Sequence, residues 1–200
     1  MRKSTARPTL PSAPLLGPTP SLAQRLRRLA LAVQGLVAAG AVLLLALLIW
    51  RMVAPAEALM ADEWLAGASI RSLLIGNFTA AVRWRMVAVS LCSMALAWAV
   101  LWQLWSLFGH YRQGAVFAAP AVRHLRRLGW LMLAHALSQP LAGALMTVAV
   151  SMDNPAGKRQ LQLSFGSDDY AGLLMALVFL AIARVMAEAA RVAAENEQFV

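Results

Sequence analysis

Residues 29–50 read LALAVQGLVAAGAVLLLALLIW, an apolar run that contains no charged residue. With a helical rise of about 1.5 Å per residue, such a run extends about 33 Å, which is enough to cross a hydrocarbon core about 30 Å thick. Three similar runs follow at residues 86–109, 128–152 and 170–187. The sequence therefore predicts an all-α membrane protein with four transmembrane helices.

The composition excludes an ordinary soluble globular protein. Hydrophobic residues make up 60% of the chain and charged residues only 14%, which leaves too little polar surface to cover a soluble protein of this size. Within the four apolar runs, His135 is the only histidine and Arg184 the only charged residue. None of the runs has the polar face that a soluble amphipathic helix needs.

The same pattern gives the domain boundaries. Residues 1–24 are rich in Pro, Ser and Thr and are expected to form a disordered cytoplasmic tail. The four-span membrane domain covers residues 25–192, with spans at about 29–51, 85–109, 127–151 and 169–188, and residues 193–200 form a cytoplasmic C-terminal tail. Ala54 to Ala58 resemble a signal-peptide cleavage site, but the preceding run is longer than a usual signal core, so an uncleaved first span is favoured.

The charged residues are divided unevenly between the two sides of the spans. The N-terminal tail, the loop at residues 110–127 and the C-terminal end hold twelve basic and three acidic residues, whereas the other two loops hold six of each. The formal net charge of +9 therefore lies wholly on one side, and the positive-inside rule places that side and both termini in the cytoplasm. Topology and contact with anionic lipid headgroups explain the basic excess, so no direct nucleic-acid binding is expected.

The first external loop is too long, at about thirty residues, to be a simple turn. Pro55 and Gly67 delimit one helical segment, and Ile70, Leu73 and Leu74 repeat at helical spacing after it. We expect short interfacial helices at the outer membrane surface; the alternative is a lid over a ligand cavity.

The second external loop leads into the fourth span. Residues 160–165 alternate in polarity, which is typical of a short strand or hairpin arm. Asp168 and Asp169 precede the fourth span, where they are expected to favour the positive end of its helix dipole and not to bind a metal.

The cytoplasmic loop and the C-terminal end carry the most recognisable sequence. Arg112-x-Gly114-x-x-Phe117 is followed by VRHLRR at residues 122–127, and the chain closes with ARVMAEAA from residue 183 and ENEQFV from residue 195. In these blocks the chain resembles a bacterial four-span membrane protein family labelled domain of unknown function 2975. The resemblance covers most of the chain from about Leu29, although Ala118 stands where members usually have a threonine.

This resemblance implies a multi-pass protein of the bacterial inner (plasma) membrane. Many members resemble components encoded beside small helix-turn-helix regulators. The family brings no established activity, cofactor or catalytic residue.

The residues themselves offer no enzymatic chemistry. Cys92 is the only cysteine, and His110, His124 and His135 lack the spacing of metal ligands. No phosphate-binding glycine motif or nucleophile elbow occurs. We expect no catalytic site, no cofactor and no metal.

One face of the third span carries small or polar residues every four positions, at His135, Gln139, Gly143 and Thr147. Counted inward from the cytoplasmic side, polar residues of three spans lie at a similar depth of about 9–12 Å. The expected intramembrane polar cluster comprises Gln34, Gln103, Ser106, His135 and Gln139, with Gln103 or Ser106 as the partner of His135. It either fixes the helix register through hydrogen bonds or forms a small polar ligand or proton site.

The fourth span continues beyond the membrane as an amphipathic helix. The candidate surface for lipid or partner contact comprises Arg112, Arg123, Arg126, Arg127, Arg184, Glu188, Arg191 and Glu195. We interpret the chain as a non-enzymatic sensor or regulatory interaction protein that presents its cytoplasmic loop and helical tail to a cytoplasmic regulatory protein. The alternative is a component of a small-molecule or ion transporter or channel, and the helical tail can also simply pack on the loop helix.

The charge distribution makes a direct prediction about topology. Cysteines introduced as Ser4→Cys and Gln198→Cys should react with a membrane-impermeant thiol reagent only after the inner membrane is permeabilised. Gly157→Cys should react in intact cells whose outer membrane has been opened. Labelling of Gly157→Cys from the cytoplasmic side alone would contradict the orientation.

Overall fold

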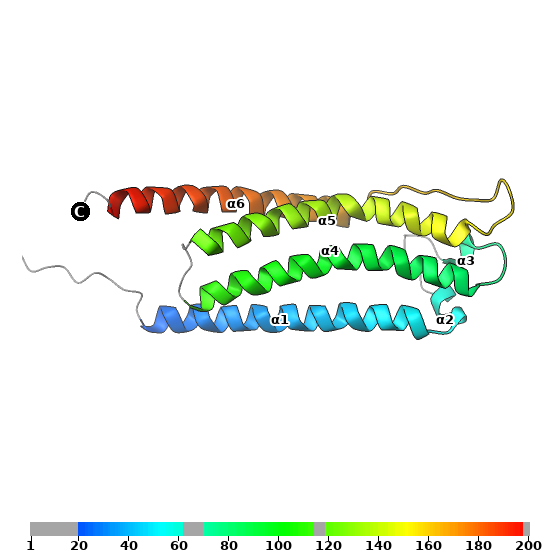
Figure 1. Cartoon of the computed structure of the whole chain (residues 1–200), viewed down its shortest axis with the longest axis horizontal. Helices are drawn as coiled ribbons and strands as arrows, with labels where there is room; N and C mark the ends of the chain where they lie inside the picture. Colours follow the sequence, from blue (N-terminus) through cyan, green and yellow to red (C-terminus); the bar gives the residue numbers. More distant parts are fainter. Residues whose placement is uncertain (1–19, 62–69, 114–118, 198–200) are drawn as a thin grey trace, which may run out of the picture.

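Four long antiparallel helices dominate the computed structural model, which describes residues 20–61, 70–113 and 119–197 (Figure 1). They are α1 (Pro20–Val53), α4 (Ala80–Arg112), α5 (Ala119–Ser151) and α6 (Ser167–Glu197). Each is long and apolar enough to cross a membrane, and no strand occurs in the described ranges. The all-α class and the four membrane-competent helices are confirmed.

The helices are longer than the apolar runs that predict them. Helices α4 and α5 each contain 33 residues, because their charged ends remain helical beyond the hydrocarbon-like part. Most of the expected disordered tail, residues 1–19, lies outside the described residues. Helix α1 already begins at Pro20, a residue whose fixed φ suits the first position of a helix.

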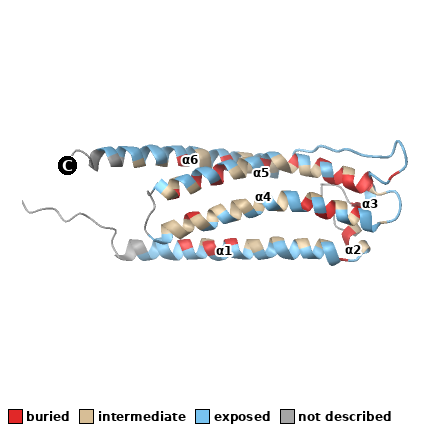
Figure 2. Cartoon of the chain, viewed as in Figure 1, coloured by how far each residue is buried: buried red, intermediate tan, exposed pale blue. Residues whose placement is uncertain are grey.

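The four long helices follow one another in the order α1, α4, α5, α6, and each packs on the long helix before and after it in the sequence (Figure 1). Burial is sparse on α1 and α6 at the edges and greater along α5 (Figure 2). Leu36 on α1, for example, is 74% exposed. Such exposure costs little when the surrounding solvent is hydrocarbon, because the hydrophobic effect acts only against water.

Helix α6 is displaced along its own axis relative to α5. We call the end of the bundle where α6 finishes the tail end and the opposite end the loop end. A Cβ added at Gly172 of α6 would lie 3.5 Å from the Cβ of Ala136 on α5, and α5 continues to Ser151, about 22 Å further toward the loop end. Helix α6 therefore begins short of the loop end and projects past α5 at the tail end (Figure 1).

The segment before α6 lies along the part of α5 that α6 leaves uncovered. The backbone N–H of Gln160 donates to Ser151 Oγ at 3.0 Å, and that of Gln162 donates to Thr147 Oγ1 at 3.1 Å. The expected strand at residues 160–165 is wrong. The amides of Gln160 and Gln162 find partners in helix hydroxyls and not in a second strand.

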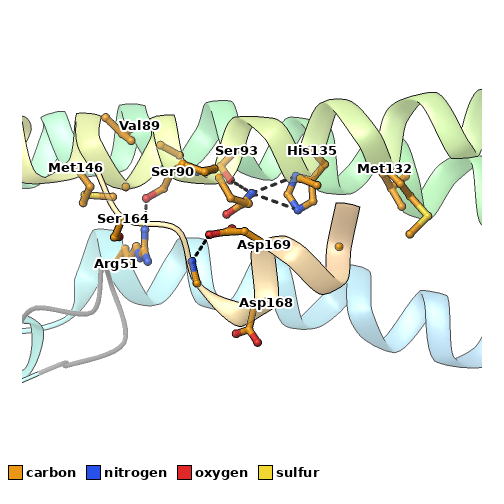
Figure 3. A pocket seen from close by; sticks show the side chains of 18 residues that line it. Arg51, Val89, Ser90, Ser93, Met132, His135, Met146, Ser164, Asp168 and Asp169 are labelled. Carbon is orange, nitrogen blue, oxygen red and sulfur yellow. Dashed lines mark hydrogen bonds between the residues drawn. The ribbon is translucent and has the colours of Figure 1, made fainter. Parts of the chain in front are cut away.

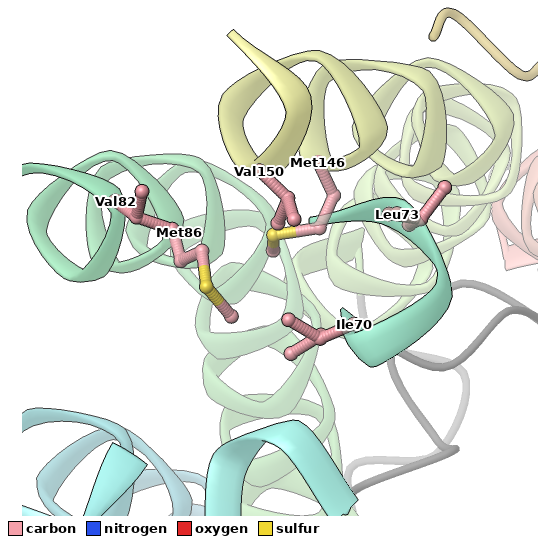
Figure 4. Packing of buried hydrophobic residues seen from close by; sticks show 6 residues of the cluster. All are labelled: Ile70, Leu73, Val82, Met86, Met146 and Val150. Atoms are coloured by element: carbon pink, nitrogen blue, oxygen red, sulfur yellow. The ribbon is translucent and has the colours of Figure 1, made fainter. Parts of the chain in front are cut away.

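The first loop contains the short helices α2 (Ala56–Ala61) and α3 (Ile70–Leu73). Side chains of α3 pack into an apolar cluster with α4 and α5 at the loop end (Figure 4), formed by Ile70, Leu73, Val82, Met86, Met146 and Val150. Helix α3 thus closes this end of the α4–α5 pair. The intervening residues 62–69, with the expected Gly67 boundary, lie outside the described residues.

Polar side chains connect the second loop to the first loop and to α4. The buried Asn154 side chain donates from Nδ2 to the Leu73 carbonyl at 2.8 Å and accepts the Ile75 N–H at Oδ1 at 2.9 Å. Arg85 Nη2 lies 2.8 Å from both carboxylate oxygens of Asp153. Both partners of that ion pair are partly exposed, so the pair contributes only about 0–1 kcal/mol, and the buried amide is the stronger tie.

The tightest approach of α5 to α6 occurs at Gly129. A Cβ added there would lie 2.8 Å from Cγ and Cδ2 of Leu180 and 3.1 Å from its backbone nitrogen. A larger residue at this position therefore forces α6 away from α5.

We predict that Gly129→Ala lowers stability. Overpacking costs about 1–3 kcal/mol, against about 0.5–1 kcal/mol gained from the better helix propensity of alanine. The matched control is Gly143→Ala on the same helix, where an added Cβ meets nothing within 4 Å. Denaturant unfolding in mixed micelles should show a lower free energy of unfolding for Gly129→Ala and no decrease for Gly143→Ala. Equal effects of the two substitutions would contradict the close approach.

Candidate binding cavity

A cavity of about 700 Å³ lies among α4, α5, the end of α1 and the beginning of α6 (Figure 3). Its volume lies within the range of about 300–1,000 Å³ that is usual for small-molecule sites. The wall combines aliphatic and methionine side chains with charged or hydrogen-bonding ones, which are Arg51, Ser90, Ser93, His135, Gln139, Ser164, Asp168 and Asp169.

Helix α5 supplies the middle of the wall. His135, Gln139 and Gly143 line the cavity, because residues four apart share one helical face. Gln139 Nε2 lies 3.2 and 3.3 Å from the two ring nitrogens of His135 and donates to Ser93 Oγ on α4 at 3.1 Å. Pro140 also lines the cavity, and as a proline inside a helix it leaves the Ala136 carbonyl without its usual intrahelical donor.

Helix α6 brings two carboxylates to the cavity. Asp169 Oδ2 accepts the Gly166 N–H at 2.8 Å, so this residue helps to fix the start of the helix, as the sequence predicts. Because α6 begins short of the loop end, Asp168 and Asp169 line the cavity instead of standing beyond the bundle. The Asp169 side chain points toward the polar wall, whereas the exposed Asp168 side chain points away from it at the rim (Figure 3). The apolar periodicity did not predict this placement, although the short apolar run at residues 170–187 indicated that α6 covers less of the bundle.

Arg51 contributes a guanidinium at the loop side of the cavity. It is the last charged residue of α1, and it donates a hydrogen bond to Ser90 Oγ on α4 (Figure 3). The wall therefore carries one permanent cation and two acidic side chains around a mostly apolar interior. Such a wall can bind a small molecule that has both a polar group and an apolar part.

The loop side of the cavity is open, because Ser164, Gly166 and Asp168 on its rim are exposed. Toward the tail end, the helices close on an apolar cluster that contains Leu107, Ala121, Leu125, Leu128 and Ala183. The polar wall ends before this cluster. No residue of α2 or α3 belongs to the wall.

His135 does not meet the partner that the sequence predicts. Its side-chain partner is Gln139, while Gln103 Oε1 accepts from His124 Nδ1 at 2.7 Å. The expected contact of His135 with Gln103 was wrong because it assumed that the helices start at one level. Ser93 of α4 lies opposite Gln139 of α5. Measured from this pair, Gln103 lies about 15 Å toward the tail end, whereas His135 lies only about 6 Å toward it.

The other two members of the expected cluster also bond elsewhere. Gln34 donates to the Trp105 carbonyl at 3.2 Å and accepts from Arg112 at 3.4 Å, which links α1 to the tail end of α4. Ser106 donates to the Trp102 carbonyl one turn earlier in its own helix at 2.9 Å. The five residues therefore divide into separate sites, and the cavity brings together His135 and Gln139.

The expected surface residues lie at the tail end. Arg191 forms ion pairs with Glu188 at 2.5 Å and Glu195 at 2.6 Å on its own helix. Arg126 of α5 and Arg184 of α6 line a second groove, and Arg123 and Arg127 are exposed on α5 near it. Among the described residues, no group of three or more His, Cys, Asp and Glu side chains could hold a metal ion.

Comparison with known proteins identifies one family. The family described as "Protein of unknown function (DUF2975)" matches residues 75–200, a range that contains α4, α5 and α6 and thus every cavity residue except Arg51. No curated protein matches the chain, and no solved structure does.

The open cavity makes a prediction about thiol reactivity at two adjacent positions. Ser93 lines the cavity, whereas Cys92 is exposed on the outer surface of the bundle. A thiol in contact with water forms the reactive thiolate, and one in contact with lipid does not. In proteoliposomes, Ser93→Cys in a Cys92→Ser background should react with a charged methanethiosulfonate at least about tenfold faster than native Cys92. Equal rates would show that water does not enter the cavity.

Proposed function

The chain belongs to the DUF2975 family, whose description names no activity, and we propose that it acts as a non-enzymatic membrane sensor. In this proposal a small ligand with polar and apolar parts occupies the cavity. Its binding shifts α6, and the projecting end of α6 presents the change to a regulatory protein.

The continuity of α6 carries this proposal. The helix runs without interruption from Ser167 to Glu197. Asp168, Asp169 and Gly172 near its beginning line the cavity, and its end projects past α5 (Figure 1). A displacement of the first turn therefore moves the whole helix and its far end.

The position of α6 at the edge of the row supports such movement. Among the other long helices it packs extensively only on α5, so one interface has to adjust when it shifts. A ligand moves α6 only if it binds one position of the helix more tightly than another. The carboxylates on α6 and the His135–Gln139 pair on α5 form opposite parts of the wall, so a ligand that contacts both senses their separation.

The charge distribution supports the proposed orientation. We place the tail end, with its basic excess, at the cytoplasmic face of a bacterial inner membrane and α2 and α3 at the outer surface. The projecting part of α6 offers exposed Val192 beside Arg191 and Glu195. A cytoplasmic regulatory protein can contact both the apolar and the charged side chains of this face.

A transporter is the second candidate, and Pro140 in the cavity wall favours it because a proline permits a helix to bend. Alternating access also requires a path to the other side of the membrane. The apolar cluster around Leu125 and Leu128 occupies that path. This closure argues against a permanently open channel, and a sensor needs no such path.

The coupling between cavity and tail can be tested by filling the cavity. Gly143 lines the cavity and Gly35 of α1 does not, and an added Cβ meets nothing within 4 Å at either position. We predict that Gly143→Trp shifts the distance between spin labels on Arg123→Cys and Val192→Cys, in a Cys92→Ser background, by about 1–2 Å or more.

Gly35→Trp is the matched control, because it adds the same indole where it does not fill the cavity. Double electron–electron resonance in nanodiscs should give the wild-type distance distribution for this control. An unchanged distribution for Gly143→Trp in a folded protein would refute the coupling.

A further inference from the structure

On the tail side of their close contact at Gly129 and Leu180, helices α5 and α6 stay packed through Ala183, Leu125 and Leu128. A groove of about 460 Å³ opens between them there, with the buried Ala183 in its floor. It shares no lining residue with the ligand cavity and only Ala183 with the apolar cluster. Its presence therefore does not depend on the sensor function proposed above.

Two arginines face each other across this groove. Arg126 is three residues from Gly129 on α5, about 4.5 Å along the axis, and Arg184 is four residues from Leu180 on the antiparallel α6, about 6 Å along it. Both residues line the groove and both are exposed. Their side chains thus start at nearly the same level on opposite walls and can reach one anion between them.

The positive charge at this level is not cancelled by the acidic side chains nearby. The groove lining holds three arginines and one glutamate. Arg191 forms ion pairs with Glu188 and Glu195 on α6, which uses the nearby carboxylates. Arg184 also interacts electrostatically with Glu188, but the lining keeps more positive than negative side chains, and Arg126 and Arg184 contribute to this excess.

The groove also has an apolar side, which favours anions that carry an apolar part. Trp130 is 59% exposed beside Arg126, and Leu180 completes the lining toward the middle of the bundle. Tryptophan is enriched where a membrane protein passes from hydrocarbon to headgroups. Arginines on the water side and apolar side chains on the membrane side match the two parts of a phospholipid.

We propose that this groove binds an anionic phospholipid, with its phosphate held between Arg126 and Arg184 and an acyl chain lying along Trp130 and Leu180. Arginine binds phosphate through paired N–H donors, which gives such contacts strength and a defined geometry. The bound lipid bridges α5 and α6 just beyond their contact at Gly129.

Lipid retention in native mass spectrometry of the full-length protein tests the proposal. The delipidated protein is titrated in detergent with dioleoylphosphatidylglycerol or dioleoylphosphatidylcholine. We expect preferential retention of phosphatidylglycerol, at least about tenfold weaker in the double variant Arg126→Gln/Arg184→Gln, since the loss of two charge-assisted hydrogen-bonding partners exceeds one factor of ten.

The matched control is Arg123→Gln/Arg127→Gln, which removes the same charge from exposed positions of α5 outside the groove lining. This control should retain the lipid as the wild type does, and Arg126→Lys/Arg184→Lys should retain more than the glutamine pair. Equal loss in both glutamine pairs, or equal retention of the two lipids, would overturn the proposal. Full competition by glycerophosphoglycerol, which has no acyl chains, would also overturn it and indicate a site for soluble phosphates.

Discussion

The close approach of α5 to α6 at Gly129 and Leu180 determines the arrangement at both ends of this molecule. Because a glycine lets the α6 backbone come within contact distance, α6 has a defined axial position beside α5. That position leaves the loop end of α5 uncovered, so residues 160–166 lie along it and the ligand cavity forms at the start of α6. The same position carries the other end of α6 past α5 at the tail end (Figure 1). A cavity, a groove and a projecting helix thus share one cause.

The bilayer explains why so open an arrangement is stable. Four helices in a row bury few of their side chains, and many leucines and tryptophans remain exposed (Figure 2). Hydrocarbon tolerates this surface but not unpaired polar groups. Among the residues that the structure describes, every buried side-chain nitrogen and oxygen has a hydrogen-bond partner. Polar residues therefore join helices, as Gln34 joins α1 to α4 and Gln139 joins α5 to α4.

The two cavities differ in the chemistry that they offer. The larger one has a guanidinium, two carboxylates and an imidazole–amide pair around an apolar interior, which suits a small molecule with mixed polarity. The groove at the tail end is dominated by arginine and tryptophan, which suits a phospholipid. Helix α6 contributes to both, and the two have no lining residue in common. A change of position of α6 would therefore alter both walls.

The sequence by itself determined the membrane class, the four helices and the family, because apolar run length and local motifs are properties of contiguous residues. It also identified the polar face of α5 that carries His135 and Gln139. Only the tertiary structure decided which residues meet, because this depends on the axial offsets between helices. Equal counting from the charged ends paired His135 with Gln103, whereas the actual offsets pair Gln103 with His124. The same offsets place the expected start of the fourth helix, with Asp168 and Asp169, at the cavity wall, since one glycine contact, invisible in apolar periodicity, fixes the axial position of α6 beside α5.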